Sequence, residues 1–216
     1  MPSAAAQKTE RPRPGRTARS RSAALLLACA LAMASALAGG CSSKPPLPPP
    51  KPYEVPQKAD SPQAVKWGYA PHALTLELNA DPELNSYDGY SHNVLLCIFQ
   101  LSDTAAFEEL AANQGGIRKL LACDRFDKSV VHFERRYISP GSQTTLVLDR
   151  AEGAQFLAVA AGYYDLDPGM VTRSWQFPLK VDQEGMLFWK SDVYSPGSLQ
   201  MDLLLGPRSI QRMGGD

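Results

Sequence analysis

The sequence predicts a mainly β protein, with a β-sandwich as its folded domain and a short helical insertion between the second and third strands. Three observations lead to this fold class. Short segments with alternating apolar and polar residues recur between residues 74 and 205, as half-buried strands require. Two segments are apolar on both faces, which indicates central strands. Only one stretch, Ser102–Asp127, is rich in helix formers. We place the domain at residues 65–207, a length that suits one hydrophobic core.

Residues 1–40 have the composition of an export signal. Five arginines and Lys8 stand against the single acid Glu10 in the first 22 residues, and an almost wholly apolar run follows from Ala23 to Ala38. A basic region, an apolar region and small residues at a cleavage site are typical of such a signal. A transmembrane anchor is the alternative, but the apolar run is shorter than the roughly 20 residues that cross a bilayer.

The signal ends in a motif that is similar to the lipobox of bacterial lipoproteins. The motif is AGGC, Ala38–Cys41, with alanine where leucine is more usual. The resemblance implies that Cys41 becomes the acylated first residue of the mature chain, and several acyl chains make a stable membrane anchor. Ser42 follows the cysteine, and no aspartate does, which favours the outer membrane over the inner one.

Removal of the signal makes the chain acidic. The whole sequence has 22 basic and 22 acidic residues, and cleavage after residue 40 leaves 16 and 21, a net charge near −5. No basic patch remains, so nucleic acid is not an expected partner.

Residues 41–64 read as a tether. Eight prolines fall between Lys44 and Ala64, and proline excludes both helix and central strand. We expect an extended spacer that reaches about 3.1 Å per residue. A proline-rich ligand for another domain is the alternative.

The folded domain begins with two strands of different character. In the first, His72–Ala80, the apolar side chains Leu74, Leu76 and Leu78 share one face. The second, Asn93–Leu101, is apolar on both faces and is expected to be central.

The later strands follow in order along the chain. Ser129–Ile138 and Gln143–Asp149 flank the turn Ser139–Ser142, and this spacing predicts a hairpin. A further central strand, Ala154–Tyr164, ends at the turn Asp165–Gly169. The last strands are Val171–Leu179 and Gly197–Gly206, with Leu199, Met201, Leu203 and Leu205 alternating in the second of them. Residues 208–216 are polar, and we expect a loose C-terminal tail.

The helical insertion lies between the second and third strands. Ser102 or Asp103 can cap its first helix, in which Phe107 and nearby apolar residues share a face, and a Gly-Gly pair at Gly115 ends it. A second short helix is expected over Ile117–Cys123.

The sequence contains no recognisable catalytic or metal-binding motif. There is no G-x-S-x-G, H-E-x-x-H or C-x-x-C, and His72, His92 and His132 are isolated. The stretch beginning at Asp165 opens like a calcium loop, but its twelfth position is Gln176 where the ion requires glutamate. We therefore expect no enzyme activity, no metal, no cofactor and no small-molecule substrate.

Cys97 and Cys123 are candidates for a disulfide. An exported protein meets an oxidising compartment in which disulfides persist. A bond between them would close a loop of about 25 residues. By lowering the chain entropy of the unfolded state, it would stabilise the fold by roughly 3–4 kcal/mol. Two buried free thiols are the alternative.

The order of several segments resembles the TssJ lipoproteins of type VI secretion systems. After the acylated cysteine and the tether come "LTLELNADPELNSYDGYSHNVLLCIFQLSDTAAFEEL", then "SPGSQTTLVLD", "FLAVAAGYYDLD" and "RSWQFP". The resemblance spans Leu74–Leu205. It implies a two-sheet, transthyretin-like sandwich on the periplasmic face of the outer membrane. It also implies binding to the periplasmic domain of TssM, within the TssJ–TssL–TssM complex.

The resemblance also implies that the loop between the first two strands, Asp81–Ser91, is a main contact with TssM. The loop contains exposed tyrosines of the kind found at binding hot spots, and it also contains three acidic residues. Without the resemblance, an ordinary long loop would be the better interpretation. The residues expected at the contact are Asp81, Glu83, Leu84, Asn85, Tyr87, Asp88 and Tyr90. The segment Lys180–Ser198 matches nothing in the family.

Two functions of other classes stay open. A lipoprotein that binds cell wall or carbohydrate could use Trp175, Trp189, Tyr163 and Tyr164 to stack on sugar rings. A periplasmic enzyme would need an acid–base pair that the sequence does not display.

Overall fold

The computed structural model describes residues 49–214 except 56 and 187. The predicted export signal, Cys41 and the first part of the tether lie outside the described residues. Within the described part of the chain, no helix is long and apolar enough to cross a bilayer.

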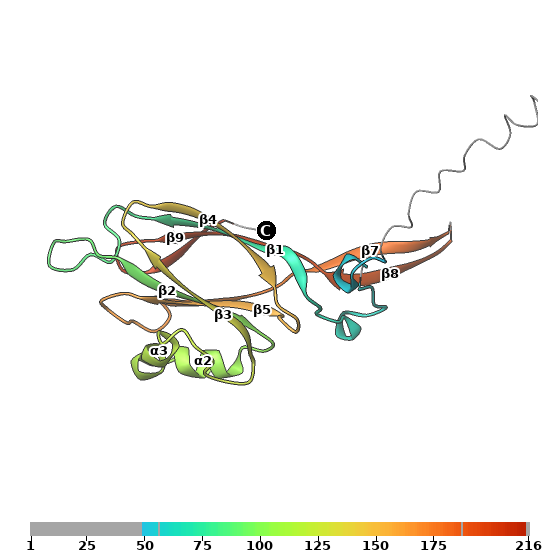
Figure 1. The fold of residues 1–216 in the computed structure, drawn as a ribbon, viewed down its shortest axis with the longest axis horizontal. Coiled ribbons are helices and arrows are strands. Elements are labelled where there is room, and N and C mark those ends of the chain that lie inside the picture. The colour runs from blue at the N-terminus through green and yellow to red at the C-terminus, as the bar shows by residue number, and fades with distance from the viewer. Residues whose placement is uncertain (1–48, 56, 187, 215–216) are drawn as a thin grey trace, which may run out of the picture. The chain divides into compact units, whose positions relative to one another are not determined.

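The domain is a β-sandwich of two four-stranded sheets, as the sequence predicts (Figure 1). One sheet has the order β10-β9-β1-β4 and the other the order β3-β2-β5-β6. The first sheet comprises β1 (Ala70–Ala80), β4 (Gln143–Arg150), β9 (Leu199–Leu205) and β10 (Ile210–Gly214). The second comprises β2 (Val94–Leu101), β3 (Val130–Ile138), β5 (Phe156–Gly162) and β6 (Thr172–Gln176).

The main core lies between the two sheets. Leu74, Leu76 and Leu78 of β1 are fully buried there, because alternate residues of a strand point to the same face. Leu96 and Ile98 of β2 meet them from the other sheet. The alternation in the sequence therefore identified the buried faces correctly.

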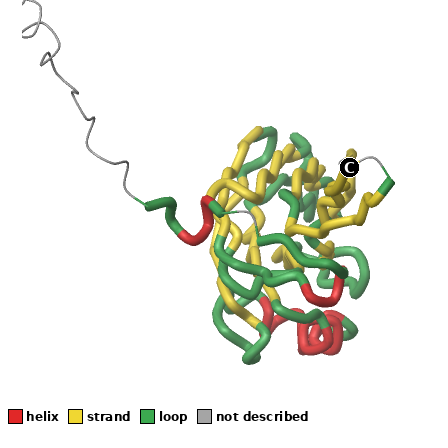
Figure 2. Tube along the Cα trace, turned by 90° about the vertical axis from the view of Figure 1, so that its right-hand side faces the viewer, coloured by secondary structure: helices red, strands yellow, loops and turns green. Residues whose placement is uncertain are grey.

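The outer face of β2 carries a second core. Cys97, Phe99 and Leu101 are buried under helices α2 (Ala105–Ala111) and α3 (Gln114–Leu120). Both helices lie on the same side of the strands (Figure 2). β2 is thus packed on two sides, which explains its unbroken apolar sequence.

A disulfide joins this second core to the helical insertion. Cys97 of β2 bonds Cys123, which follows α3, with their Cα atoms 5.1 Å apart. The predicted pairing is confirmed. It fastens α2 and α3 to the central strand.

The predicted hairpin of residues 129–149 is wrong. β3 pairs with β2, whereas β4 pairs with β1, so the turn Ser139–Ser142 crosses from one sheet to the other. A tight reversal with a glycine at positive φ, Gly141 here, serves both connections equally well. The local sequence cannot distinguish them, because partner choice depends on which edge of β1 is free.

The loose tail predicted for residues 208–216 is also wrong for the part that the structure describes. β10 adds antiparallel to the edge of β9, and Ile210 is only 1% exposed. Backbone hydrogen bonds and one buried isoleucine hold this strand in place. Because the rest of the segment is polar, its composition did not predict a strand.

The end of the tether lies against the domain instead of extending freely. Short 3-10 turns occur at Pro52–Glu54 and Pro62–Ala64. Ala59 exchanges backbone hydrogen bonds of 2.8 and 2.9 Å with Tyr194. Proline spacing excludes a long helix but does not prevent the residues between prolines from pairing with a neighbouring strand.

The partner of this tether segment is a separate β-hairpin. It consists of β7 (Leu179–Met186) and β8 (Trp189–Pro196), which pair with each other in a two-stranded sheet and with no strand of the sandwich. The hairpin accounts for most of Lys180–Ser198, a segment in which the sequence predicted no strands, and it projects from one end of the sandwich (Figure 1).

Candidate partner-binding site

The loop between β1 and β2, residues 81–91, is built on a fixed base. The carboxylate of Asp81 accepts a hydrogen bond from the Glu83 N–H at 2.7 Å, and its carbonyl accepts one from the Leu84 N–H at 2.9 Å. The Leu84 side chain is fully buried in the main core. These contacts fix the course of the chain where it leaves the sandwich.

Asn85 ties the loop to the connection between β5 and β6. Its side-chain oxygen accepts a hydrogen bond from the Tyr164 N–H at 2.7 Å, and its amide donates to the Asn93 carbonyl at 3.3 Å. The residue is 7% exposed and has a φ of +51°. Asparagine tolerates this left-handed conformation better than most residues. Asn85 can therefore adopt the backbone conformation of the turn and also link the loop to the β5–β6 connection through its side chain.

The tip of the loop is a tight turn. Tyr87 and Tyr90 exchange backbone hydrogen bonds of 2.9 and 3.0 Å, and the two residues between them have positive φ, +50° at Asp88 and +75° at Gly89. An Asp-Gly pair is the sequence favoured for this turn. Both tyrosines are therefore presented by a short, hydrogen-bonded scaffold.

The tip presents aromatic surface. Tyr90 is 72% exposed. Tyr87 stacks on Tyr164, with ring centroids 3.5 Å apart and planes 21° from parallel. A hydrogen bond to Tyr87 raises the pKa of Tyr164. Tyrosines held in this way lose little conformational entropy on binding, which is why they serve as interface anchors.

A cavity of about 410 Å³ lies beside the tyrosine pair, between the loop, the β5–β6 connection and Pro207–Arg208. The Ser86 N–H donates to the Pro207 carbonyl at 3.0 Å and closes one side of it. Exposed Asp165 and Arg208 line this cavity, and the exposed acids Glu83 and Asp88 belong to the loop itself. An aromatic centre with a charged rim has the composition of a protein-binding patch.

Two residues predicted for the contact surface are not on it. Leu84 and Asn85 are buried and position the loop from below. The sequence places them next to exposed residues, but a loop must be fastened by some of its own side chains. Asp81, Glu83, Tyr87, Asp88 and Tyr90 all keep some exposure to solvent.

Tyr164 is a surface residue of this patch, whereas the sequence had suggested it for stacking on sugar rings. It lies 77 positions beyond Tyr87, and no local pattern links the two. Its neighbour Tyr163 is 4% exposed and donates its hydroxyl to the Ser209 carbonyl at 2.9 Å, and burial raises the pKa of that hydroxyl. Adjacent residues of an extended chain point to opposite sides. This alternation could have predicted that one tyrosine of the pair is buried and the other exposed.

The aromatic residues suggested for sugar stacking do not form one platform. Tyr163 is buried, and Trp175 is partly buried against the main core. Trp189 is 86% exposed but belongs to the β7–β8 hairpin. The geometry thus gives no support to the carbohydrate-binding alternative.

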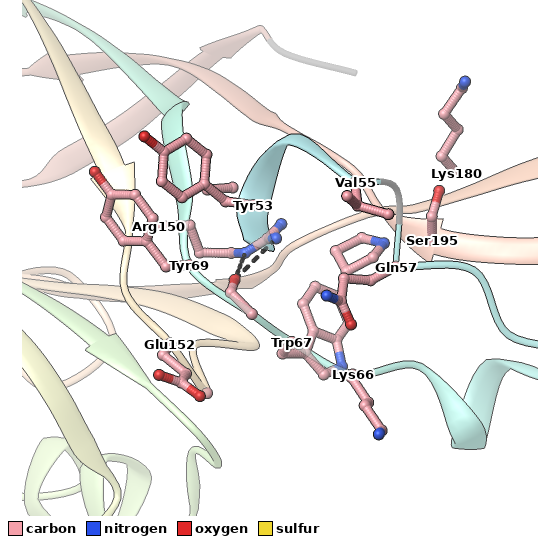
Figure 3. A pocket seen from close by; sticks show the side chains of 14 residues that line it. Tyr53, Val55, Gln57, Lys66, Trp67, Tyr69, Arg150, Glu152, Lys180 and Ser195 are labelled. Atoms are coloured by element: carbon pink, nitrogen blue, oxygen red, sulfur yellow. Dashed lines mark hydrogen bonds between the residues drawn. The ribbon is translucent and has the colours of Figure 1, made fainter. Parts of the chain in front are cut away.

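A larger cavity, about 900 Å³, lies where the tether, β4 and the hairpin meet (Figure 3). Arg150, 3% exposed, donates to the carbonyls of Gly68 at 3.2 and 3.4 Å and of Gly197 at 2.9 Å. Its guanidinium lies 5.4 Å from the Trp67 ring centroid and 5.8 Å from that of Phe177. Burial lowers the pKa of Arg150.

The bonds of Arg150 join the segment before β1 to the connection between β8 and β9. The residue thus fastens the base of the hairpin to the sandwich and is a structural group. Within the described residues, no three His, Cys, Asp or Glu side chains are grouped as metal ligands.

Comparison with known proteins gives a consistent result. A family model described as type VI secretion lipoprotein, VasD, EvfM, TssJ matches residues 72–206. No curated protein matches the sequence. Among solved structures, the T6SS lipoprotein TssJ1 from Pseudomonas aeruginosa is 17% identical with a TM-score of 0.50, covering 69% of this chain and 96% of that one.

Two further solved structures are similar. Lip from Serratia marcescens, a membrane-bound component of the type VI secretion system, is 18% identical with a TM-score of 0.49 and covers 65% of this chain and 96% of that one. A chain described as the TssM C-terminal domain from EAEC is 15% identical with a TM-score of 0.48, covering 65% of this chain and 97% of its own.

Proposed function

Because the chain belongs to the TssJ family of type VI secretion lipoproteins, we propose that it is anchored by acylated Cys41 in the outer membrane, on the periplasmic face. From there it binds the periplasmic domain of TssM and tethers the envelope-spanning complex of TssJ, TssL and TssM. The observation that carries the proposal is the tyrosine-tipped loop, Asp81–Ser91, held rigid by its own turn and by Asn85.

The loop has the anatomy of a partner-binding site. Tyr90 and the stacked pair of Tyr87 and Tyr164 offer apolar area with little entropy to lose. The exposed acids Glu83 and Asp88 stand at the rim, where charges act mainly on the association rate and its salt dependence. The proposed partner surface is therefore a groove for aromatic side chains with basic residues around it.

The position of the loop suits a bridge between a membrane and a partner. The loop follows the last residue of β1, Ala80, whereas the residue before β1, Tyr69, lines the cavity beside the tether. β1 has 11 residues, so its two ends are about 33 Å apart. The end that leads to Cys41 is thus remote from the proposed contact.

Replacement of Tyr87 and Tyr90 by alanine tests the proposal. We expect the affinity for the periplasmic domain of TssM, measured by calorimetry, to fall by about 2 kcal/mol or more. Asp88→Ala is expected to do much less. Tyr137→Ala is the matched control, because Tyr137 is 70% exposed, close to the 72% of Tyr90, but lies on β3.

Thermal unfolding should change little in these tyrosine variants, since loop tips contribute little to the core. Full binding by the double variant would remove the loop from the interface. Equal losses in the double variant and in Tyr137→Ala would contradict the assignment of the contact to this loop.

A further inference from the structure

The tip of the β7–β8 hairpin is apolar although it is fully accessible to water. Met186 is 80% exposed, Phe188 92% and Trp189 86%. Met186 and Trp189 are the last pair of the β7–β8 ladder. A cluster of exposed apolar side chains of this kind marks an interaction site.

Most of the exposed apolar surface of the hairpin is at the tip, and Val181 near the base is 52% exposed. Behind the tip, the strands carry Glu184, Lys190 and Asp192, all exposed. The two strands pair with no strand of the sandwich and hold this arrangement away from it. The apolar tip can enter an apolar medium, and the charged residues behind it limit the depth of insertion.

The size of the tip favours a bilayer over a protein as the medium it enters. A stable protein interface buries about 800 Å² on each partner. One exposed aromatic side chain offers only about 150–250 Å², so Met186, Phe188 and Trp189 together fall short of that area. Insertion into a membrane interface needs no shape complementarity, and tryptophan and phenylalanine are favoured there.

The described end of the tether lies alongside this hairpin. Lys58 forms an ion pair with Glu184, close to the tip, and Ala59 pairs with Tyr194 in the middle of β8. Tyr53 and Val55 line the cavity at the hairpin base together with Lys180 and Ser195 (Figure 3). The membrane-proximal part of the chain and the hairpin therefore lie side by side.

The remaining tether is long enough for both groups to reach one bilayer. Tyr53 is twelve positions after Cys41, a reach of about 37 Å at 3.1 Å per residue. The hairpin extends only about 20 Å from Lys180 to Met186 at 3.3 Å per residue. The acyl chains can thus enter the membrane at the level of the tip.

We propose that Met186, Phe188 and Trp189 insert into the surface of the lipid bilayer that holds Cys41, as a second membrane contact beside the acyl chains. The inference rests on the lipid anchor of the proposed function. The anchor raises the local concentration of the tip at the membrane, so a weak insertion suffices. Two contacts fix the orientation of the domain, with the loop Asp81–Ser91 directed away from the lipid.

Quenching of tryptophan fluorescence by brominated lipids tests this inference. The acylated mature chain is bound to vesicles of phosphatidylethanolamine and phosphatidylglycerol with and without bromine in the acyl chains. We expect at least twofold more quenching in the parent than in Trp189→Phe, because Trp67 and Trp175 are partly buried in the domain. Phe188→Ser is expected to reduce the quenching of Trp189 at least twofold. Tyr137→Ser, a change at an exposed aromatic residue of β3, should leave it unaltered.

The outcomes separate this inference from its premise. A chain that does not sediment with vesicles overturns the anchor and the insertion together. If the chain sediments but parent and Trp189→Phe are quenched equally, the insertion is overturned and the anchor stands. A dimer in solution that dissociates in Phe188→Ser would assign the tip to a second copy and overturn the inference as well. None of these measurements involves TssM, so they leave the partner-binding proposal untouched.

Discussion

Asn85 offers a direct test of how the partner-binding loop is held. Replacement by alanine removes the acceptor of the Tyr164 N–H, now at 2.7 Å, and the donor to the Asn93 carbonyl at 3.3 Å. A buried polar group left without a partner costs about 1–3 kcal/mol, and the long second bond belongs at the low end. We expect about 2–3 kcal/mol from the two bonds together.

The backbone adds a second, separable cost at the same position. The φ of Asn85 is +51°, and a left-handed conformation costs an ordinary residue about 1–2 kcal/mol. Glycine adopts it freely but has more conformational freedom to lose on folding, about 0.5–1 kcal/mol. Asn85→Ala should therefore lower the free energy of unfolding by about 3–5 kcal/mol, and Asn85→Gly by roughly 1 kcal/mol less.

Urea unfolding of the mature chain, without its acyl groups, measures both numbers. Asn85→Asp is the third variant, since it keeps an acceptor for the Tyr164 N–H and loses only the amide donor. Binding to TssM should weaken in Asn85→Ala, because Tyr164 would no longer be fixed beside Tyr87. Loss of less than about 0.5 kcal/mol in Asn85→Ala would refute the role of these bonds. Equal losses for alanine and glycine would refute the contribution of backbone strain.

Three further predictions concern the anchor, the disulfide and the helix packing. Cys41→Ser should abolish palmitate labelling and leave an uncleaved precursor or a soluble protein; labelling that persists would contradict the anchor. Cys123→Ala should cost about 2–5 kcal/mol and increase hydrogen exchange in α2 and α3 more than in the strands, whereas uniform exchange would show that the bond stabilises no particular region. Gly116→Ala should destabilise by about 1–3 kcal/mol, because its Cβ would lie 2.0 Å from the Leu110 carbonyl oxygen. Gly115→Ala is the matched control in thermal unfolding, since its Cβ would meet only the Asn113 side chain at 3.3 Å, and equal effects would contradict the close packing.

Much of the domain could be predicted from the sequence because it depends on local patterns. Alternating leucines identified the buried face of β1, and an unbroken apolar run identified β2 as packed on two sides. The disulfide was predicted from two cysteines in a chain expected to be exported. Each of these features depends on the residues of a short segment and on whether their side chains are buried from water.

Part of the candidate site was accessible in the same way. Tyr87 and Tyr90 flank an Asp-Gly turn, so their exposure follows from local turn chemistry. The stacking of Tyr87 on Tyr164 was not accessible, because it joins the β1–β2 loop to the β5–β6 loop, which are far apart in the sequence. The burial of Leu84 and Asn85 was missed for the same reason, since their partners lie in the core and in another loop.

Local patterns thus predicted the class of fold and the succession of most strands along the chain, and the export and acylation that we propose are likewise inferred from local patterns. Only the tertiary structure decided which strands pair, and therefore that β3 and β4 belong to different sheets and that β10 completes the edge of β9. It also placed the tether against the β7–β8 hairpin. The physical reason is that burial preference and turn geometry act within a few residues, whereas strand pairing and side-chain stacking depend on which surfaces remain free once the rest of the chain has folded.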